Sequence, residues 1–186
     1  TPSFLHVTPN GLNDPTVGSQ TGWGGYFRWG LSPDSLTTCY TNADPAVRYI
    51  SEKYEKYFYP AIFANFIARM DWAAYGKGNR NPIVIVNGEK GLSPIIIEPE
   101  TEEELQLNAS ESADPDKDKL TFHWWILPEA GTYTSTVSIR EADKANAFLR
   151  IPQDAAGKEL HIICEVTDNG TPALTSYRRV IIRPKR

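Results

Sequence analysis

The feature that most constrains the fold is a regular succession of short β-type segments in the second half of the chain. After Pro82 they recur about every ten residues, with turn residues between them. They cover residues 83–86, 95–98, 103–109, 120–127, 132–139, 147–151, 159–167 and 174–182. This number and spacing of short strands are typical of an Ig-like antiparallel β-sandwich.

One aromatic strand, residues 120–127, predicts how the sandwich presents its side chains. Phe122 and Trp124 alternate with His123 and Trp125, and a pleated strand sends the two sets to opposite faces. We therefore expect Trp124 in the core between the sheets, and His123 and Trp125 on the outer face of one sheet.

In an Ig-like sandwich this strand shares a sheet with the last two strands of the chain. That arrangement aligns His123 and Trp125 with Tyr177 on the same outer face. An outer face of this kind is normally polar, so an aromatic one must be covered. Two covers are open: the helical segment 46–75, or a polysaccharide whose sugar rings stack on Trp and Tyr.

The first half of the chain contains the helical pattern. Asp44 is a suitable N-cap with Pro45 at the first helical position, and Gly76 is a suitable C-terminal stop. Pro60 removes an amide donor, so we expect it to end one helix and begin a second. The second helix carries an apolar stripe that should face a neighbour, consisting of Phe63, Phe66, Ile67, Met70 and Ala74.

These patterns predict a mainly β protein, an Ig-like antiparallel β-sandwich preceded by a small α-helical segment. The expected division is residues 1–76 with two helices, a linker at 77–82 and the sandwich at 83–186.

A glycine-rich segment, residues 22–30, lacks the spacing and the Lys-Ser/Thr of a phosphate loop. Its glycines let the backbone approach closely while Trp23, Tyr26 and Trp29 are presented. Two interpretations stay open, because these rings either line a ligand cleft or pack inside the fold.

Charge and composition exclude some partners. A net charge of -4 and a pI near 5.4 give no electrostatic footprint for nucleic acid. No apolar run reaches the roughly 20 residues of a membrane span. Cys39 and Cys164 are expected to be buried thiols rather than a disulfide.

No catalytic residue is predicted, because the sequence has neither a Gly-x-Ser-x-Gly motif nor a carboxylate pair marked out by its surroundings. Asp114, Asp116 and Asp118 alternate in a turn, and their oxygens suit Ca²⁺. An EF-hand loop is excluded, since it needs Gly and Glu where Lys119 and Trp125 stand. A looser calcium turn and a turn closed by local hydrogen bonds both stay open.

Several stretches together resemble one family of secreted bacterial proteins described as cellulose-binding, in which a nucleoside-hydrolase-like domain is followed by an Ig-like domain. In the first half the likeness is carried by TPSFL at 1–5, PNGL at 9–12, WGGY at 23–26 and ARMDW at 68–72. In the second half it is carried by DPD at 114–116, LTFHWW at 120–125, EAGTY at 129–133 and HIICEVTDNGTP at 161–172.

The resemblance implies that the chain is the C-terminal portion of a longer protein, with residues 1–76 as the tail of an α/β hydrolase-like domain. It also implies export, to the periplasm or out of the cell. Nucleoside hydrolases hold Ca²⁺ with an aspartate cluster that does not occur here, so no catalytic or metal residue is carried over.

The leading hypothesis is a non-catalytic module that binds a cellulose-like polysaccharide or its own upstream domain. The residues expected to contact sugar are Trp125, Tyr177, His123, Trp23, Tyr26 and Trp29. One alternative is a scaffold for a glycosidic-bond hydrolase whose catalytic residues lie upstream. A second alternative is a structural spacer or a subunit-contact domain.

Overall fold

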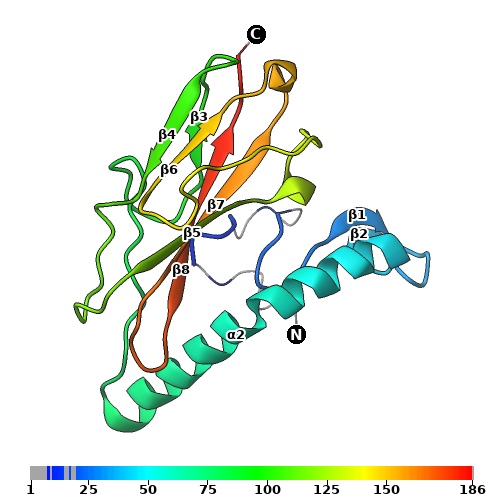
Figure 1. Cartoon of the computed structure of the whole chain (residues 1–186). Coiled ribbons are helices and arrows are strands. Elements are labelled where there is room, and N and C mark those ends of the chain that lie inside the picture. The colour runs from blue at the N-terminus through cyan, green and yellow to red at the C-terminus, as the bar shows by residue number, and fades with distance from the viewer. Residues whose placement is uncertain (1–7, 9, 15–16, 18–19, 186) are drawn as a thin grey trace.

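A computed structural model of the chain describes residues 8, 10–14, 17 and 20–185 (Figure 1). One sheet has the strand order β3-β8-β7-β5, and β4 pairs with β6 in a second sheet. The strands of the first sheet are β3 (Ile95–Ile97), β5 (Thr121–Ile126), β7 (Leu160–Thr167) and β8 (Thr175–Ile182). Those of the second are β4 (Glu104–Asn108) and β6 (Asn146–Arg150). All these pairs are antiparallel except β3 with β8.

The core lies between the two sheets, as the alternation predicts. Trp124 of β5 is 1% exposed, and its indole Nε1 donates to the carbonyl of Lys144 at 2.9 Å. Leu107 and Leu149 face it from the opposite sheet, and Cys164 of β7 packs beside it. The mainly β, Ig-like sandwich is therefore confirmed. Both cysteines are free thiols, although Cys39 is only partly buried.

Two predicted strands are wrong. Residues 132–139 form no strand in the described chain, and residues 83–86 contribute only isolated bridges. The backbone amides of Thr132 and Tyr133 both donate to the carbonyl of Glu159, which leaves this segment outside a regular ladder. The apolar side chains of residues 132–139 still pack against the core. They therefore give the apolar pattern of a strand although the segment has no regular strand pairing.

The helical segment is one continuous helix, α2 (Pro45–Tyr75), and the predicted break at Pro60 is wrong. The caps are as predicted, since Asp44 accepts from the amides of Ala46 and Val47, and Gly76 is left-handed with φ 66°. The same helix face is buried before and after the proline, which itself is exposed. These contacts on both sides offset the hydrogen bond that Pro60 removes.

The predicted apolar stripe faces solvent instead of a neighbour. Phe63 is 51% exposed, Phe66 55% and Met70 49%. The buried face of α2 consists of Val47, Ser51, Tyr54, Phe58, Asn65 and Ala68. The helix therefore presents to the sandwich the face that begins with Tyr54 and Phe58, and the second stripe lies on another side.

This buried helix face covers the outer face of the sheet, where α2 crosses the sandwich (Figure 1). Tyr54 and Phe58 pack with Ile163 and Tyr177 in a second apolar cluster. The helical cover is thus the correct one of the two alternatives at Trp125, Ile163 and Tyr177, while Leu12 and Thr21 accept hydrogen bonds from Arg179 on the same face. In the described residues, no helix combines the length and apolarity that a membrane span needs.

The remaining elements flank this contact. The hairpin of β1 (Arg28–Leu31) and β2 (Thr38–Thr41) stands at the N-terminal end of α2 (Figure 1). Short 3-10 turns occur at Pro128–Ala130 and Gln153–Ala155. In the predicted linker, Asn79 Nδ2 donates to Asp168 Oδ1 and to the carbonyl of Pro172, both at 2.9 Å. The division into three parts stays a prediction.

Candidate functional site

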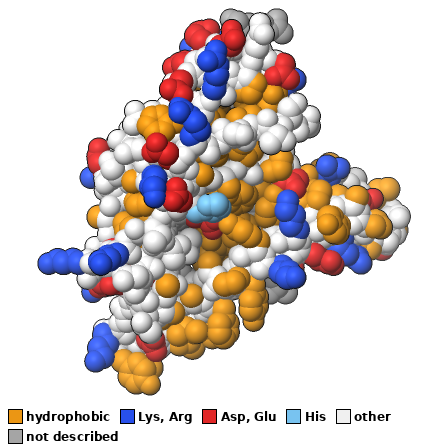
Figure 2. Space-filling view, in the orientation of Figure 1, with side chains coloured by type: hydrophobic (Ala, Val, Ile, Leu, Met, Phe, Trp, Pro, Cys, Tyr) orange, Lys and Arg blue, Asp and Glu red, His pale blue; other side chains and the backbone are white. Residues whose placement is uncertain are grey.

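Where α2 passes the edge of β5, the two elements form an open groove of about 360 Å³, which we call the aromatic groove. It is lined by Lys53, Tyr54, Tyr57, His123, Trp125, Ile126 and Pro128. In Figure 2 hydrophobic side chains gather across the middle of this face of the molecule, with charged side chains and a histidine beside them. The groove combines ring surfaces with polar tips, as small-ligand sites do.

Aromatic contacts hold the rings of this groove in place. Trp125 stacks on Tyr54, with ring centroids 6.3 Å apart, and meets Tyr57 edge-on at 5.5 Å. Tyr57 is 47% exposed, whereas Trp125 is half-buried. The groove therefore offers the exposed ring of Tyr57 and the accessible part of Trp125 to a ligand.

One carboxylate fixes both of these rings. Glu165 lies opposite His123 in the pairing of β5 with β7. Its Oε2 accepts from the Tyr57 hydroxyl at 2.6 Å and from the Trp125 indole Nε1 at 2.8 Å. Burial raises the pKa of Glu165, and the two hydrogen bonds only partly oppose this. Glu165 is thus a positioning residue for the two rings.

A second carboxylate holds two residues that line the groove. Glu129 accepts from the Tyr54 hydroxyl and from Lys53 Nζ, the latter at 3.0 Å. Burial alone would raise the pKa of Glu129, but these two hydrogen bonds bring it below its ordinary value. The arrangement supplies donors and acceptors for hydroxyl groups.

The structure brings together two of the predicted contact residues, Trp125 and His123. The sequence interpretation missed Lys53 and Tyr57, which enter from the helix. Tyr57 follows Tyr54 by three residues, so the two lie on neighbouring positions of one helix face. This spacing is the sequence signal that could have identified Tyr57. Its hydrogen bond with Glu165 depends on how the helix is rotated, which the spacing does not give.

Trp29 lies elsewhere, on the β1–β2 hairpin. It is 64% exposed and meets Tyr40 edge-on, with ring centroids 5.2 Å apart. Tyr26 is buried, and its hydroxyl accepts from Arg28 Nε at 2.9 Å. Close approach of the backbone is confirmed at Gly25, where a Cβ would collide with Ser51 Oγ.

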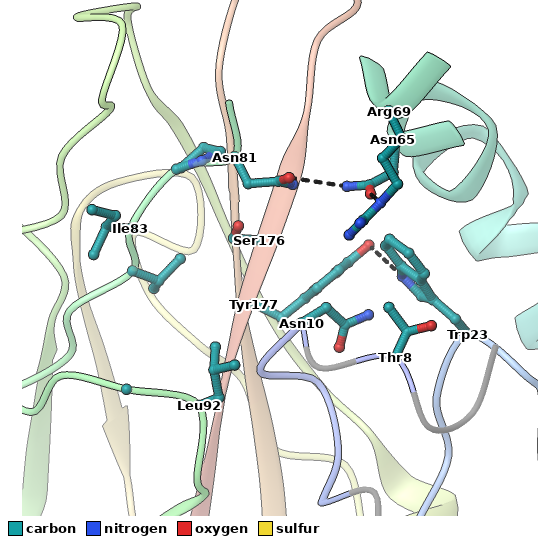
Figure 3. Close-up of a pocket in the computed structure, with 13 residues that line it drawn as sticks. Thr8, Asn10, Trp23, Asn65, Arg69, Asn81, Ile83, Leu92, Ser176 and Tyr177 are labelled. Carbon is teal, nitrogen blue, oxygen red and sulfur yellow. Dashed lines mark hydrogen bonds between the residues drawn. The ribbon is translucent and has the colours of Figure 1, made fainter. Parts of the chain in front are cut away.

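Trp23 and Tyr177 line a separate pocket of about 260 Å³ (Figure 3). The Trp23 indole donates to the Tyr177 hydroxyl at 3.3 Å, and the rings are only 3% and 1% exposed. The expectation that Trp23, Tyr26 and Tyr177 stack on sugar therefore does not fit their burial. Their rings pack within the fold, and Phe58 of α2 covers that of Tyr177 edge-on, with ring centroids 5.7 Å apart.

The polar wall of this pocket joins the helix to the sandwich. Arg69 Nε donates to Asn65 Oδ1 at 2.9 Å, and Asn65 Nδ2 donates to Asn81 Oδ1 at 3.1 Å (Figure 3). Asn81 Nδ2 in turn donates to the carbonyl of Thr175 at 3.2 Å. These side chains are engaged with one another, so the pocket wall clamps α2 against β8.

The acidic turn has the local hydrogen bonds of the simpler alternative. Asp114 Oδ1 accepts from the amides of Asp116 at 2.8 Å and Asp118 at 3.1 Å. Asp116 Oδ2 accepts from the amide of Arg80 at 2.8 Å. Among the residues that the structure describes, no three His, Cys, Asp or Glu side chains are grouped to hold a metal ion. Calcium at this turn stays a prediction.

Comparison with known proteins agrees with the resemblance. Residues 104–184 match the family model described as the C-terminal domain of cellulose-binding protein Sde0182. None of the curated proteins matches this sequence. The whole chain superimposes on a nucleoside hydrolase-related hypothetical protein from Saccharophagus degradans, described as associated with carbohydrate metabolism, with a TM-score of 0.87 and 36% identity. It covers 47% of that protein, so it spans less than half of its length.

Two other solved structures match more weakly. The PKD domain of KIAA 1837 protein is 19% identical, and the match covers 53% of this chain and 94% of that domain with a TM-score of 0.33. Cadherin domains 3–6 of protocadherin Gamma B2 are 13% identical, with coverage of 59% and 27% and a TM-score of 0.39. TM-scores this low do not support any conclusion about the fold of this chain. The predicted resemblance is nevertheless confirmed by the stronger matches, since residues 104–184 match the model of the C-terminal domain of cellulose-binding protein Sde0182 and the whole chain is similar to a nucleoside hydrolase-related protein.

Proposed function

We propose that this chain is a non-catalytic module of an exported protein and binds a cellulose-like polysaccharide at the aromatic groove. The observation that carries the proposal is the pair Tyr57 and Trp125, two rings held in an open groove by the Glu165 carboxylate. The match to a cellulose-binding family supports the choice of ligand.

The chemistry of the groove suits a sugar. The axial C–H groups of a pyranose make one side of the ring apolar, and that side packs against an aromatic ring. The hydroxyl groups at its rim need hydrogen-bond partners. Lys53 Nζ and the exposed His123 stand at the edge of the same groove. Because the rings are fixed before binding, little conformational entropy is lost when a sugar stacks on them.

Retention on insoluble cellulose tests the proposal. We expect the intact chain to be retained, and Tyr57→Ala to weaken retention about fivefold to tenfold, the loss of one ring contact. Trp125→Ala should weaken it at least as much. Tyr75→Ala is the matched control, because Tyr75 is 72% exposed and lies at the far end of α2. Circular dichroism checks that each variant is folded.

Failure of the intact chain to bind cellulose would refute the proposal. Equal loss in Tyr57→Ala and Tyr75→Ala would place binding outside the aromatic groove. Normal binding in Tyr57→Ala and Trp125→Ala would do the same.

A second candidate function is a scaffold for a hydrolase of glycosidic bonds. One observation favours it: this chain is similar to 47% of the length of a nucleoside hydrolase-related protein. In that case a longer polypeptide would hydrolyse nucleosides while the 186-residue chain would not. The third reading, a spacer or subunit contact, predicts self-association without cellulose retention, which light scattering measures.

A further inference from the structure

A second groove, of about 410 Å³, lies between the β1–β2 hairpin and the sandwich. We call it the hairpin groove. Rings and ionisable groups share its wall, among them Trp29, Tyr40, Glu129, Glu159, His161 and Arg183. Of these six residues, only Trp29 is expected from the sequence to contact sugar.

Trp29 and Tyr40 form the ring surface of the hairpin groove. They are directly opposite each other in the pairing of β1 with β2, so they lie on the same face of the hairpin. Trp29 is 64% exposed and Tyr40 is 47% exposed. The hairpin therefore presents two adjacent rings to whatever enters the groove.

His161 supplies a hydrogen-bond donor in the opposite wall. Its side chain is buried, and its Nδ1 lies 3.0 Å from Nη1 of the buried Arg179. A guanidinium only donates, so Nδ1 accepts and the ring proton of neutral His161 is on Nε2. Nε2 has no hydrogen-bond partner among the described residues. The nearest carboxylate oxygen, Glu159 Oε2, is 3.7 Å away, too far for a hydrogen bond.

A buried N–H without a partner is unfavourable unless a ligand or water satisfies it. A sugar hydroxyl beside His161 and Glu159, within reach of both, would accept from Nε2–H and donate to the carboxylate. Glu159 is already held in place by Arg183, whose Nε donates to it at 2.7 Å. The pair therefore offers one donor and one acceptor to a hydroxyl group.

Glu129 links the walls of the two grooves. Glu129 is one of the residues that line the hairpin groove, while Lys53 and Tyr54, which donate hydrogen bonds to its carboxylate, line the aromatic groove. We infer that the hairpin groove is a second subsite for the same polysaccharide, in which a sugar stacks on Trp29 and Tyr40 and one hydroxyl bridges His161 and Glu159. This inference rests on the proposed function and extends it from one sugar contact to a chain of several sugars.

Soluble oligosaccharides of different length test the second subsite in the full chain. Titration of ¹⁵N-labelled protein with cellobiose and with cellohexaose reports separately on the indole signals of Trp29 and Trp125. If one glycan occupies both grooves, cellohexaose binds at least about tenfold more tightly than cellobiose and shifts both signals. The Nε2 signal of His161 should shift with them.

Three variants separate the inference from the proposed function. Trp29→Ala should remove most of the advantage of cellohexaose over cellobiose, and Glu159→Gln should reduce it. Tyr75→Ala should leave it unchanged. If Tyr57→Ala weakens cellohexaose while Trp29→Ala does not and the Trp29 signal stays in place, the second subsite is wrong and the aromatic groove stands. If neither oligosaccharide binds the intact chain, the proposed function itself fails.

Discussion

Arg179 and His161 form a buried pair in which the guanidinium donates to the imidazole Nδ1 at 3.0 Å. Arg179 also donates to the carbonyl of Thr21 at 2.8 Å and to that of Leu12 at 2.5 Å. Arg179 therefore ties Leu12 and Thr21, from the first half of the chain, to the outer face of the sheet. No carboxylate accepts from Arg179 within the described chain, and burial lowers the pKa of this guanidinium to about 9.

The pair makes stability depend on pH. Burial and the charge of Arg179 lower the pKa of His161 from 6.5 to about 4. Between these values the unfolded chain binds more protons at this residue than the folded chain, so the free energy of unfolding falls as pH drops from about 6.5 to about 4. The shift corresponds to at most about 3 kcal/mol.

Urea unfolding between pH 4 and pH 8 measures this effect. His161→Gln keeps an acceptor for Arg179 and removes the titration, so its stability should depend less on pH than that of the unmodified chain. His123→Gln is the control, because His123 is exposed. Identical pH profiles for the unmodified chain and His161→Gln would show that the pair does not control acid stability.

Two phenylalanines on α2 should differ sharply in their contribution to stability. Phe58 is 1% exposed and contacts Trp125 and Tyr177, whereas Phe63 is 51% exposed. Phe58→Ala should lower the free energy of unfolding by about 3–5 kcal/mol, and Phe63→Ala by less than about 0.5 kcal/mol. Chemical denaturation of both variants checks this. A large loss in Phe63→Ala would mean that the outer helix face is covered in solution.

The same two residues show how far the sequence could predict this fold. Alternation in residues 120–127 correctly separates Trp124 from Trp125, because the side-chain period of a strand allows only two faces. A helix has no such restriction, and α2 carries two apolar stripes, one through Phe58 and one through Phe63. The stripe through Phe58 is the buried one because it packs against Trp125 and Tyr177 on the sheet. The predicted break at Pro60 is wrong because tertiary contacts on both sides of the proline keep the helix intact.

The aromatic groove was predictable only in part for the same reason. The strand pattern places Trp125 and His123 together, and the pairing of β5 with β7 adds Glu165. Tyr57 joins them only after the rotation of α2 is fixed by Tyr54 and Phe58. The glycine-rich rings were ambiguous from the start, and burial divides them, since Trp23 and Tyr26 pack inside while Trp29 is exposed.

Glu165 should contribute through its hydrogen bonds rather than through its charge. Burial raises the pKa of Glu165, so the folded chain holds a proton there more strongly than the unfolded chain. The free energy of unfolding therefore falls as the pH rises from the ordinary pKa of a glutamate to the raised pKa of Glu165. Glu165→Gln keeps an acceptor oxygen without a charge to desolvate. We expect its stability at pH 7 to equal or exceed that of the unmodified chain by up to about 1 kcal/mol.

Glu165→Ala is the matched comparison. It leaves the Trp125 indole and the Tyr57 hydroxyl without their acceptor, and should lower the free energy of unfolding by about 1–3 kcal/mol. It should also weaken cellulose retention, because the two rings lose their fixed orientation. Equal stability of the Gln and Ala variants would contradict the positioning role of Glu165.

Calcium at the acidic turn is the last prediction. Asp114 Oδ2 and Asp168 Oδ2 are buried and lack a hydrogen-bond partner in the part of the chain that is described. Burial, followed by the charges of Asp114, Asp168 and Asp116, raises the pKa of Asp118. Crowded carboxylates with unsatisfied oxygens are stabilised by a hard cation. We therefore expect millimolar Ca²⁺ to raise the melting temperature.

The size of the effect follows from mass action. A site with a dissociation constant of about 10⁻⁴ M, as in extracellular modules, gives about 2 kcal/mol at 5 mM Ca²⁺. Asp118→Asn relieves repulsion, so this variant should melt slightly higher than the unmodified chain without calcium and respond less to it. Asp143→Asn is the control, because Asp143 is exposed outside the turn. A cation that binds the folded chain must raise its melting temperature. If Ca²⁺ leaves the melting temperature unchanged, the calcium prediction is wrong, and the role of the three aspartates is the local one shown by the amide hydrogen bonds of Asp114.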